Sequence, residues 1–208
     1  MSTTIQVRDA TRADVPQIVE VHREAFPGFL MTLLGPAFLR RYYETVLDYE
    51  KRVFVVTTDE QGQLRGFAAG FLCPADFYKL LGTRKRKMMI AGALHVAIRP
   101  AVWARVIENM GQVGQRAQVD SQATTHAVEL ASIGVSRAVT GKGWGKALVT
   151  GFIARAREIG GQVVELTTDA EGNERVNAFY QGLGFCLVTT SSRAGGRKMN
   201  HYECSTAS

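Results

Sequence analysis

Six stretches of the chain have the alternation of apolar and polar residues, or the β-branched and aromatic content, that predicts β-strands. Arg52 to Thr58 and Leu64 to Leu72 flank a polar turn at Asp59 to Gln63, so we expect them to form an antiparallel hairpin. The predicted strands are residues 5–8, 52–58, 64–72, 127–135, 162–167 and 185–190.

Helical spacing of apolar residues predicts helices between these strands. The first should begin at Val15, after a capping box made by Thr11 and Asp14, and end at Pro27. The others are expected over residues 30–47, with an interruption near Gly35, and over residues 145–159 and 174–183. The order of the elements is mixed α and β.

Residues 74–125 interrupt this order between the third and fourth predicted strands. They contain the basic run Arg84 to Lys87, an apolar stretch, a helical pattern over Val102 to Met110 and a polar loop after it. We therefore expect a helical and basic insertion at about 74–125 inside a single domain, residues 1–208.

Composition narrows the class of protein. A chain of 208 residues with 46% hydrophobic content can bury one sizeable core. The longest uncharged apolar run, Met88 to Ile98, is about half of the roughly 20 residues that cross a membrane, and residues 1–9 hold no apolar signal core. The three cysteines are not at metal-ligand spacing, so we expect a reduced, cytoplasmic, metal-free protein. They are Cys73, Cys186 and Cys204.

The formal net charge of +6 is compatible with an anionic partner but is also common in soluble proteins. One short basic run without interleaved aromatic residues does not support nucleic-acid binding. Arg84 to Lys87, with Phe77, Tyr78 and Arg99 nearby, could attract an anionic acceptor or contact an acidic membrane surface. A solvated helix face or loop explains the same run equally well.

The most informative stretch runs from Glu129 through a glycine-rich turn to Lys146. A strand, a turn with Gly141, Gly143 and Gly145, and the start of a helix direct several backbone N–H groups to one place, which suits a phosphate. The spacing matches neither the Gly-x-x-x-x-Gly-Lys-Ser/Thr loop nor the Gly-x-Gly-x-x-Gly dinucleotide motif. An ordinary tight turn remains the alternative.

This stretch resembles the principal motif of the Gcn5-related N-acetyltransferase (GNAT) superfamily, Gln/Arg-x-x-Gly-x-Gly/Ala. Gly143 and Gly145 stand at the two glycine positions, whereas Thr140 replaces the usual Gln or Arg. A second stretch, Asn173 to Phe185, is similar to the Asn-x-x-Ala-x-x-Leu-Tyr-x-x-x-Gly-Phe segment of that family, except that Asn177 replaces an apolar residue. The two motifs stand in the expected order.

The resemblance implies the GNAT fold: a central, mixed, mostly antiparallel twisted sheet of 6–7 strands flanked by helices, with a helical insertion between strands 3 and 4. It also implies acetyl-CoA as cosubstrate, with its pantetheine arm along the fourth strand and its diphosphate at the glycine-rich turn. The residues that would bind the coenzyme are Ile133, Gly134, Val135, Thr140, Gly141, Lys142, Gly143, Trp144, Gly145, Lys146 and Asn173. For Asn173, capping of the following helix is the alternative.

The resemblance further implies two catalytic side chains. Glu129 stands where one branch of the family has its glutamate base, although a water chain could remove the proton of the amine instead. Tyr180 stands at the position of the tyrosine that protonates the leaving thiolate, with a core tyrosine as the alternative. No histidine stands at catalytic spacing from Ser132 or Ser136, so we expect direct attack by the amine.

The expected reaction is acetyl transfer from acetyl-CoA to a primary amine of a small molecule, such as an aminosugar or a nucleotide-linked aminosugar. The alternatives are a non-catalytic acyl-CoA sensor and an enzyme that acetylates a protein or peptide amine. The protein is expected to be a monomer or a homodimer, with the exposed edge of the last predicted strand as the place for a dimer contact.

Overall fold

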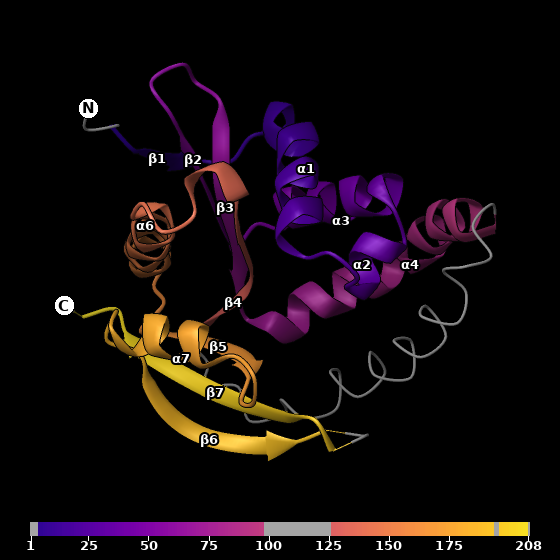
Figure 1. Ribbon diagram of the computed structural model, residues 1–208. Helices are drawn as coiled ribbons and strands as arrows, with labels where there is room; N and C mark the ends of the chain where they lie inside the picture. The colour runs from indigo at the N-terminus through magenta and orange to yellow at the C-terminus, as the bar shows by residue number, and fades with distance from the viewer. Residues whose placement is uncertain (1–3, 98–125, 194–195, 208) are drawn as a thin grey trace.

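The computed structural model describes residues 4–97, 126–193 and 196–207 and contains a seven-stranded sheet in the order β1-β2-β3-β4-β5-β7-β6 (Figure 1). Every neighbouring pair is antiparallel except β4 and β5. The predicted mixed, mostly antiparallel sheet is confirmed. The strands are β1 (Gln6–Asp9), β2 (Arg52–Thr58), β3 (Leu64–Leu72), β4 (Ala127–Val135), β5 (Val163–Asp169), β6 (Cys186–Ser192) and β7 (Lys198–Ser205).

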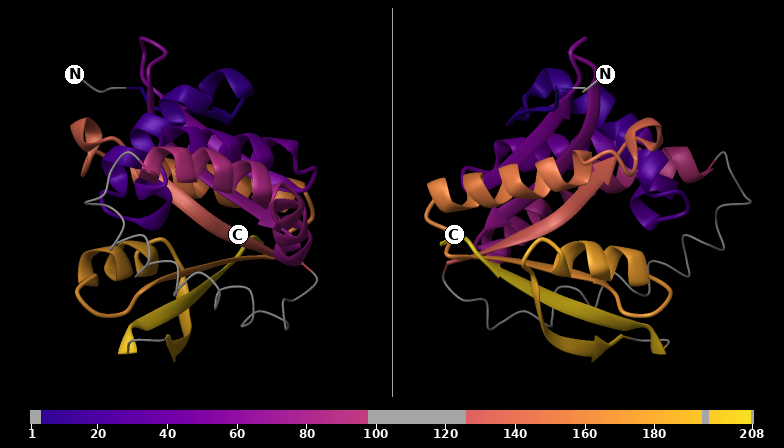
Figure 2. Two further views of the ribbon diagram at one scale, coloured as in Figure 1. Left: turned by 90° about the vertical axis from the view of Figure 1, so that its right-hand side faces the viewer. Right: turned by 60° about the vertical axis from the view of Figure 1, so that its left-hand side comes forward.

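Helices cover both faces of the sheet. One face carries α1 (Val15–Ala25), α3 (Pro36–Asp48) and α4 (Pro74–Ala97), with the short α2 (Leu30–Leu33) beside them. The other face carries α6 (Trp144–Glu158) and α7 (Glu174–Gln181), and Figure 2 shows the two sets on opposite sides. Each face has its own hydrophobic core, and the sheet separates the two.

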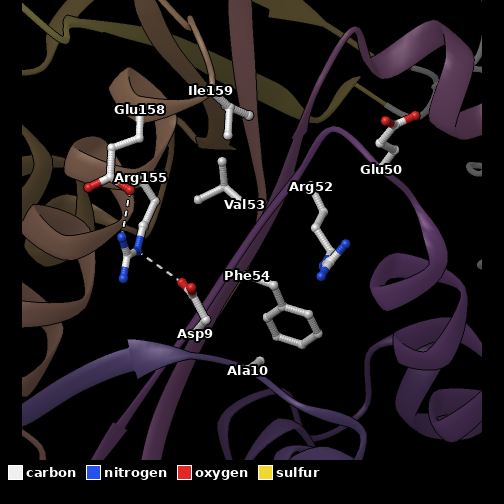
Figure 3. A pocket seen from close by; sticks show the side chains of 9 residues that line it. All are labelled: Asp9, Ala10, Glu50, Arg52, Val53, Phe54, Arg155, Glu158 and Ile159. Carbon is white, nitrogen blue, oxygen red and sulfur yellow. Dashed lines mark hydrogen bonds and ion pairs between the residues drawn. The ribbon is translucent and has the colours of Figure 1, made fainter.

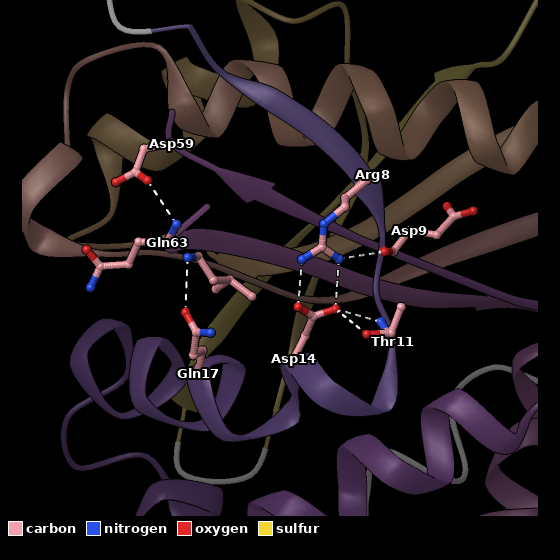
Figure 4. Close-up of polar contacts among 8 residues, drawn as sticks. Arg8, Asp9, Thr11, Asp14, Gln17, Asp59 and Gln63 are labelled. Atoms are coloured by element: carbon pink, nitrogen blue, oxygen red, sulfur yellow. Dashed lines mark hydrogen bonds and ion pairs between the residues drawn. The ribbon is translucent and has the colours of Figure 1, made fainter. Parts of the chain in front are cut away.

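A polar cluster fixes the chain between β1 and α1 (Figure 4). The Asp14 carboxylate accepts hydrogen bonds from the Thr11 backbone N–H and hydroxyl, both at 2.8 Å, and from two nitrogens of Arg8 at 2.7 and 2.8 Å. The predicted capping box of Thr11 and Asp14 is present, and the Thr11 hydroxyl also donates to the Asp14 carboxylate. Nearby, the Gln17 side chain accepts a bond from the Leu64 N–H and ties α1 to β3.

The helix predicted over residues 30–47 is two helices. Gly35 lies between them with a φ of 92°, a left-handed conformation that favours glycine, and Pro36 begins α3. The bend turns α3 so that Tyr43 and Leu39 face the sheet, and both are fully buried.

The strand β7 was not predicted from the sequence, whereas a helical insertion after β3 was. β7 was missed because two buried residues, Met199 and Asn200, follow each other and break its alternation. In the insertion, Pro74–Ala97 forms one helix of 24 residues, although apolar and polar residues show little segregation along it. The helical pattern at 102–110 lies outside the described residues.

Candidate active site

The sheet opens between its two parallel strands. β4 pairs with β5 through Ala127, Val128 and Glu129, and beyond them β4 has no partner on that side among the described residues. On its other side β4 stays paired with β3, with an extra residue, Ala131, inserted where the register shifts. Figure 2 shows the two halves of the sheet diverging. The backbone of Ile133 to Val135 is thus left with an open edge of the kind that can bind an extended ligand.

The glycine-rich turn lies at the end of this open stretch and forms the start of α6. Gly141 and Gly143 have φ values of 79° and 86°, and a Cβ at either position would meet no atom within 4 Å. Gly143 caps α6, whose first helical hydrogen bond runs from the Ala147 N–H to the Gly143 carbonyl. The N–H groups of the first turn therefore have no helical acceptor and can bind an anion.

The side chains of the turn differ in what they can offer. Lys142 and Lys146 are exposed, and the Lys142 Nζ donates to the Ala138 carbonyl at 3.1 Å. Trp144 is 2% exposed, so only its backbone is available to a ligand. The Thr140 hydroxyl donates to the Ser136 carbonyl at 3.3 Å. It carries no positive charge that could pair with a phosphate. These residues fit a diphosphate through backbone donors and Lys146 more than through Thr140.

Two further glycines at the site serve packing. A Cβ on Gly145 would lie 3.3 Å from the Phe179 ring, which places α7 directly beside the start of α6. A Cβ on Gly134 would lie 2.8 Å from Phe67, so this glycine lets β4 approach the core on the α1 face. The backbone of Gly134 remains on the open edge of β4.

Glu129 stands on the last rung that β4 shares with β5, opposite Glu165. Its carboxylate accepts a hydrogen bond from the Tyr78 hydroxyl, with oxygen separations of 2.9 and 3.1 Å. Tyr78 belongs to α4, so the insertion reaches the predicted base. The next residue across the sheet is Glu203 of β7, and the three carboxylates form one row on the α4 face.

Tyr180 lies on the opposite face, in the core between α7 and the sheet. Its ring packs against Phe179, Phe185 and Tyr202, and its side chain is 6% exposed. Burial raises the pKa of Tyr180 to about 12. The side chain is therefore a protonated phenol at neutral pH, which can donate a hydrogen bond.

Asn173 stands at the N-cap position of α7, but its side chain points back to β5. The Asn173 Nδ2 donates to the Thr168 hydroxyl at 2.7 Å, and no side-chain cap bond is made. Asn177, the polar departure from the family pattern, is buried and donates to the Asn173 and Asp169 carbonyls. Its Oδ1 accepts bonds from Asn200 and Tyr202, so β7 supplies the partners that the sequence did not reveal.

The described side chains of the basic run differ in their surroundings. Arg84 forms an ion pair with Asp48 of α3, and Arg86 and Lys87 are exposed. Phe77 is fully buried, and Arg99 lies outside the described residues.

A hollow of about 200 Å³ elsewhere is separate from this site. It lies where β1 and β2 meet the end of α6 and is lined by Asp9, Arg52, Phe54, Arg155 and Glu158 among others (Figure 3). Arg155 spans it with ion pairs to Asp9 and Glu158. The candidate site is instead the opening of β4, where an open strand edge and an anion-binding helix start adjoin.

In residues 4–97, 126–193 and 196–207, no group of three or more His, Cys, Asp or Glu side chains could hold a metal ion. Within the same ranges no helix has the length and apolar content needed to cross a membrane.

A sequence model of the acetyltransferase (GNAT) family matches residues 15–185. Solved structures share the fold. A spermidine N-acetyltransferase, a SpeG chimera from Vibrio cholerae and hSSAT, has a TM-score of 0.63 at 12% identity over 98% of this chain and 96% of its own. yncA from Salmonella typhimurium, solved with its cofactor acetyl-CoA, has a TM-score of 0.60 at 15% identity over 99% and 95%.

A GCN5-related N-acetyltransferase from Kribbella flavida has a TM-score of 0.59 at 18% identity, over 97% of both chains. No curated protein is similar enough in sequence to count as a match. Because the family model spans most of its length, this chain belongs to the GNAT family of N-acetyltransferases.

Proposed function

We propose that this protein transfers the acetyl group of acetyl-CoA to a primary amine of a small molecule by direct attack of the amine. The observation that carries the proposal is the opening of β4 away from β5 after three rungs, directly before the anion-binding start of α6. A ligand with an extended arm and a diphosphate fits that sequence of groups. When bound, acetyl-CoA would supply an acetyl group activated as a thioester.

The backbone is proposed to hold the coenzyme. The open edge of Ile133 to Val135 offers hydrogen bonds to an extended arm, and the first turn of α6 offers N–H donors to a diphosphate. Lys146 adds positive charge at that turn, and the absent Cβ of Gly143 keeps the backbone accessible. Asn173 is proposed to bind the coenzyme as well, from the far side of the opening.

Glu129 is proposed to accept the proton of the attacking amine, directly or through water. An alkylamine has a pKa near 10 and is mostly protonated at pH 7, so attack needs a group that removes the proton. Tyr78 holds the Glu129 carboxylate in one orientation through its hydroxyl. On the other face, Tyr180 is proposed to donate a proton to the departing thiolate, and its pKa of about 12 means that the phenol gives up this proton less readily than a free tyrosine would.

The acceptor proposed from the sequence is an aminosugar, free or nucleotide-linked. The row of Glu129, Glu165 and Glu203 favours a second candidate, an acceptor with more than one amino group, such as a polyamine or an aminoglycoside. Carboxylates attract such a cation and repel a nucleotide diphosphate. Arg84, which would have favoured an anionic acceptor, is engaged by Asp48.

The proposal is tested by isothermal titration with acetyl-CoA and by a thiol-release assay with aminosugars, their nucleotide-linked forms, polyamines, aminoglycosides and peptide amines. Coenzyme binding with turnover on one class of amine supports it and fixes the acceptor. Coenzyme binding without turnover on any amine would favour the non-catalytic sensor. A peptide amine as the best acceptor would identify a protein acetyltransferase instead.

A further inference from the structure

A chain of three buried or half-buried polar side chains crosses the core of the α1 face. His22 of α1 lies with its Nδ1 2.6 Å from the Tyr43 hydroxyl of α3, and that hydroxyl is 3.4 Å from the hydroxyl of Ser132 in β4. His22 is 4% exposed and Tyr43 is fully buried. The sequence motifs do not involve His22 or Tyr43, and the catalytic roles proposed above use none of the three residues.

The last member of the chain lies on the open stretch of β4. Ser132 directly follows the extra residue of the bulge and is beyond the last rung with β5, so no described strand pairs with β4 on that side of Ser132. Its side chain points to the helical face of the sheet toward which Glu129 also points, since Ser132 contacts Tyr43 of α3 and Glu129 contacts Tyr78 of α4. Ser132 is half-buried, which leaves it accessible to a ligand in the opening.

The direction of the hydrogen bonds follows from the unpaired atom of the imidazole. His22 Nε2 is buried and has no hydrogen-bond partner among the described residues, and the ring lies between Phe26 and Phe67. Orphaned buried N–H groups are rare, so we place the single ring proton on Nδ1, where it is donated to Tyr43. Burial lowers the pKa of His22 to about 4, so the ring is neutral at pH 7.

With that tautomer, Tyr43 accepts from His22 and donates its own proton to Ser132. The Ser132 oxygen is then occupied as an acceptor, and its hydroxyl proton is free to point into the opening. Successive donors polarise one another and strengthen the terminal donor. If Tyr43 and His22 only filled space, apolar residues could do so without burying polar atoms. Their polar groups and the direction of their hydrogen bonds therefore point to a role for Ser132.

We propose that Ser132 is a further active-site residue, oriented by the buried pair Tyr43 and His22, and that its hydroxyl donates a hydrogen bond to the thioester carbonyl oxygen of acetyl-CoA. The inference rests on the proposed function, because it places the acetyl group beside Ser132. Tyr43 and His22 are positioning residues that act through the serine.

The decisive measurement is the preference for acetyl-CoA over CoA, which differ by the carbonyl that Ser132 would contact. Both ligands are titrated calorimetrically into the wild-type protein and into Ser132→Ala and Tyr43→Phe. One lost hydrogen bond should lower the ratio of the two affinities about five-fold in each variant. The double variant should lose no more than either single one, because the two residues act as a unit.

Tyr49→Phe is the matched control. Tyr49 is another buried tyrosine of the same core, but its hydroxyl donates to the Leu72 carbonyl at 2.8 Å and does not lead to Ser132. It should leave the preference for acetyl-CoA unchanged. Ser132→Ala removes one atom from a half-buried position, so it keeps the test valid even if Tyr43→Phe fails to fold.

The outcomes separate the two proposals. A wild-type protein that binds acetyl-CoA but keeps its full preference in Ser132→Ala overturns the role of Ser132 and leaves the proposed function intact. A wild-type protein that binds neither ligand overturns both. With an acceptor in hand, Ser132→Ala should lower kcat about 100-fold with the acceptor KM unchanged, and Tyr49→Phe should not.

Discussion

At the scale of single residues, Tyr180 shows how burial makes a phenol hold its proton more tightly than a free tyrosine does. Its pKa of about 12 keeps it protonated through the whole range in which an amine acetyltransferase can be assayed. Tyr180→Phe should lower kcat at least 10-fold, with little change in the affinity for acetyl-CoA. Stopped assays from pH 6 to 10 check this, and the wild-type rate should show no loss near pH 10 caused by ionisation of Tyr180. Full turnover of the variant at every pH would exclude the proposed role.

Glu129 is one of three carboxylates in a row. A second member of the row can therefore serve to separate the proposed role of Glu129 as a base from the attraction that any carboxylate has for a cationic acceptor. Glu129→Gln should lower kcat about 100-fold at pH 7 and recover part of the loss at higher pH, where more of the amine is already neutral. Glu203→Gln is the control, because it removes a charge from the same row at an exposed position two strands away. Equal losses in both variants would indicate that the row only attracts the acceptor.

The Asp14 carboxylate should stabilise the fold in a pH-dependent way. Hydrogen bonds from Arg8 lower the pKa of Asp14 to about 2, below the 3.8 of an unperturbed aspartate. Its stabilisation is therefore complete above about pH 5 and is lost as the pH falls toward 2. Asp14→Asn should lower the free energy of unfolding by roughly 1–2 kcal/mol at pH 7, and the loss should vanish near pH 2.

Urea unfolding at several pH values measures this effect. Asp9→Asn is the comparison, since its pair with Arg155 is exposed on both sides and should contribute less than about 0.5 kcal/mol. A loss in Asp14→Asn that stayed constant down to pH 2 would show that the carboxylate charge is not its source.

At the scale of elements, α6 has a left-handed glycine at each end. Gly143 precedes the helix with a φ of 86°, and Gly160 follows it with the same φ. Gly143→Asp should weaken acetyl-CoA binding at least 100-fold, because a carboxylate at the start of the helix repels the diphosphate. Gly160→Asp imposes the same backbone strain far from the turn and should bind the coenzyme normally. Similar weakening in both, measured calorimetrically, would mean that strain alone is responsible.

The elements that the sequence predicted are those with clear local signals. The hairpin of β2 and β3 and the strand β4 have the predicted bounds, because they alternate or are rich in β-branched residues and are flanked by turns. β7 was missed because Asn200 and Met199 are buried side by side by partners that lie far away in the sequence. The break at Gly35 was predicted as an interruption, but only the structure shows two separate helices.

The candidate site also has parts that could be predicted from the sequence and parts that could not. The glycine-rich turn could be located from spacing alone, since backbone donors need only glycines and the start of a helix. The contact of Tyr78 with Glu129 could not, because it joins residues 51 positions apart. His22 and Tyr43 are spaced like ordinary helix core residues, and only the tertiary packing that directs them to Ser132 distinguishes them.

At the scale of the whole molecule, the first half of the insertion is part of the core. Phe77 of α4 is fully buried and stacks on Phe71 of β3, with ring centroids 3.7 Å apart. Phe77→Ala should lower the free energy of unfolding by about 3–5 kcal/mol. Ile90→Ala, in the same helix but 55% exposed, should lower it by less than about 0.5 kcal/mol. Chemical denaturation compares the two, and a small loss in Phe77→Ala would show that α4 is an appendage.

The three rungs between β4 and β5 also have a mechanical consequence. They are the only strand pairing, among the described residues, between the half of the sheet that ends at β4 and the half formed by β5, β7 and β6. So short a junction can act as a hinge, and a ligand bound along the open edge of β4 would make it more rigid. Amide exchange in β5 and β7 would then slow on coenzyme binding. A partner at the exposed outer edge of β6 would meet a stiffer surface whenever the coenzyme is bound.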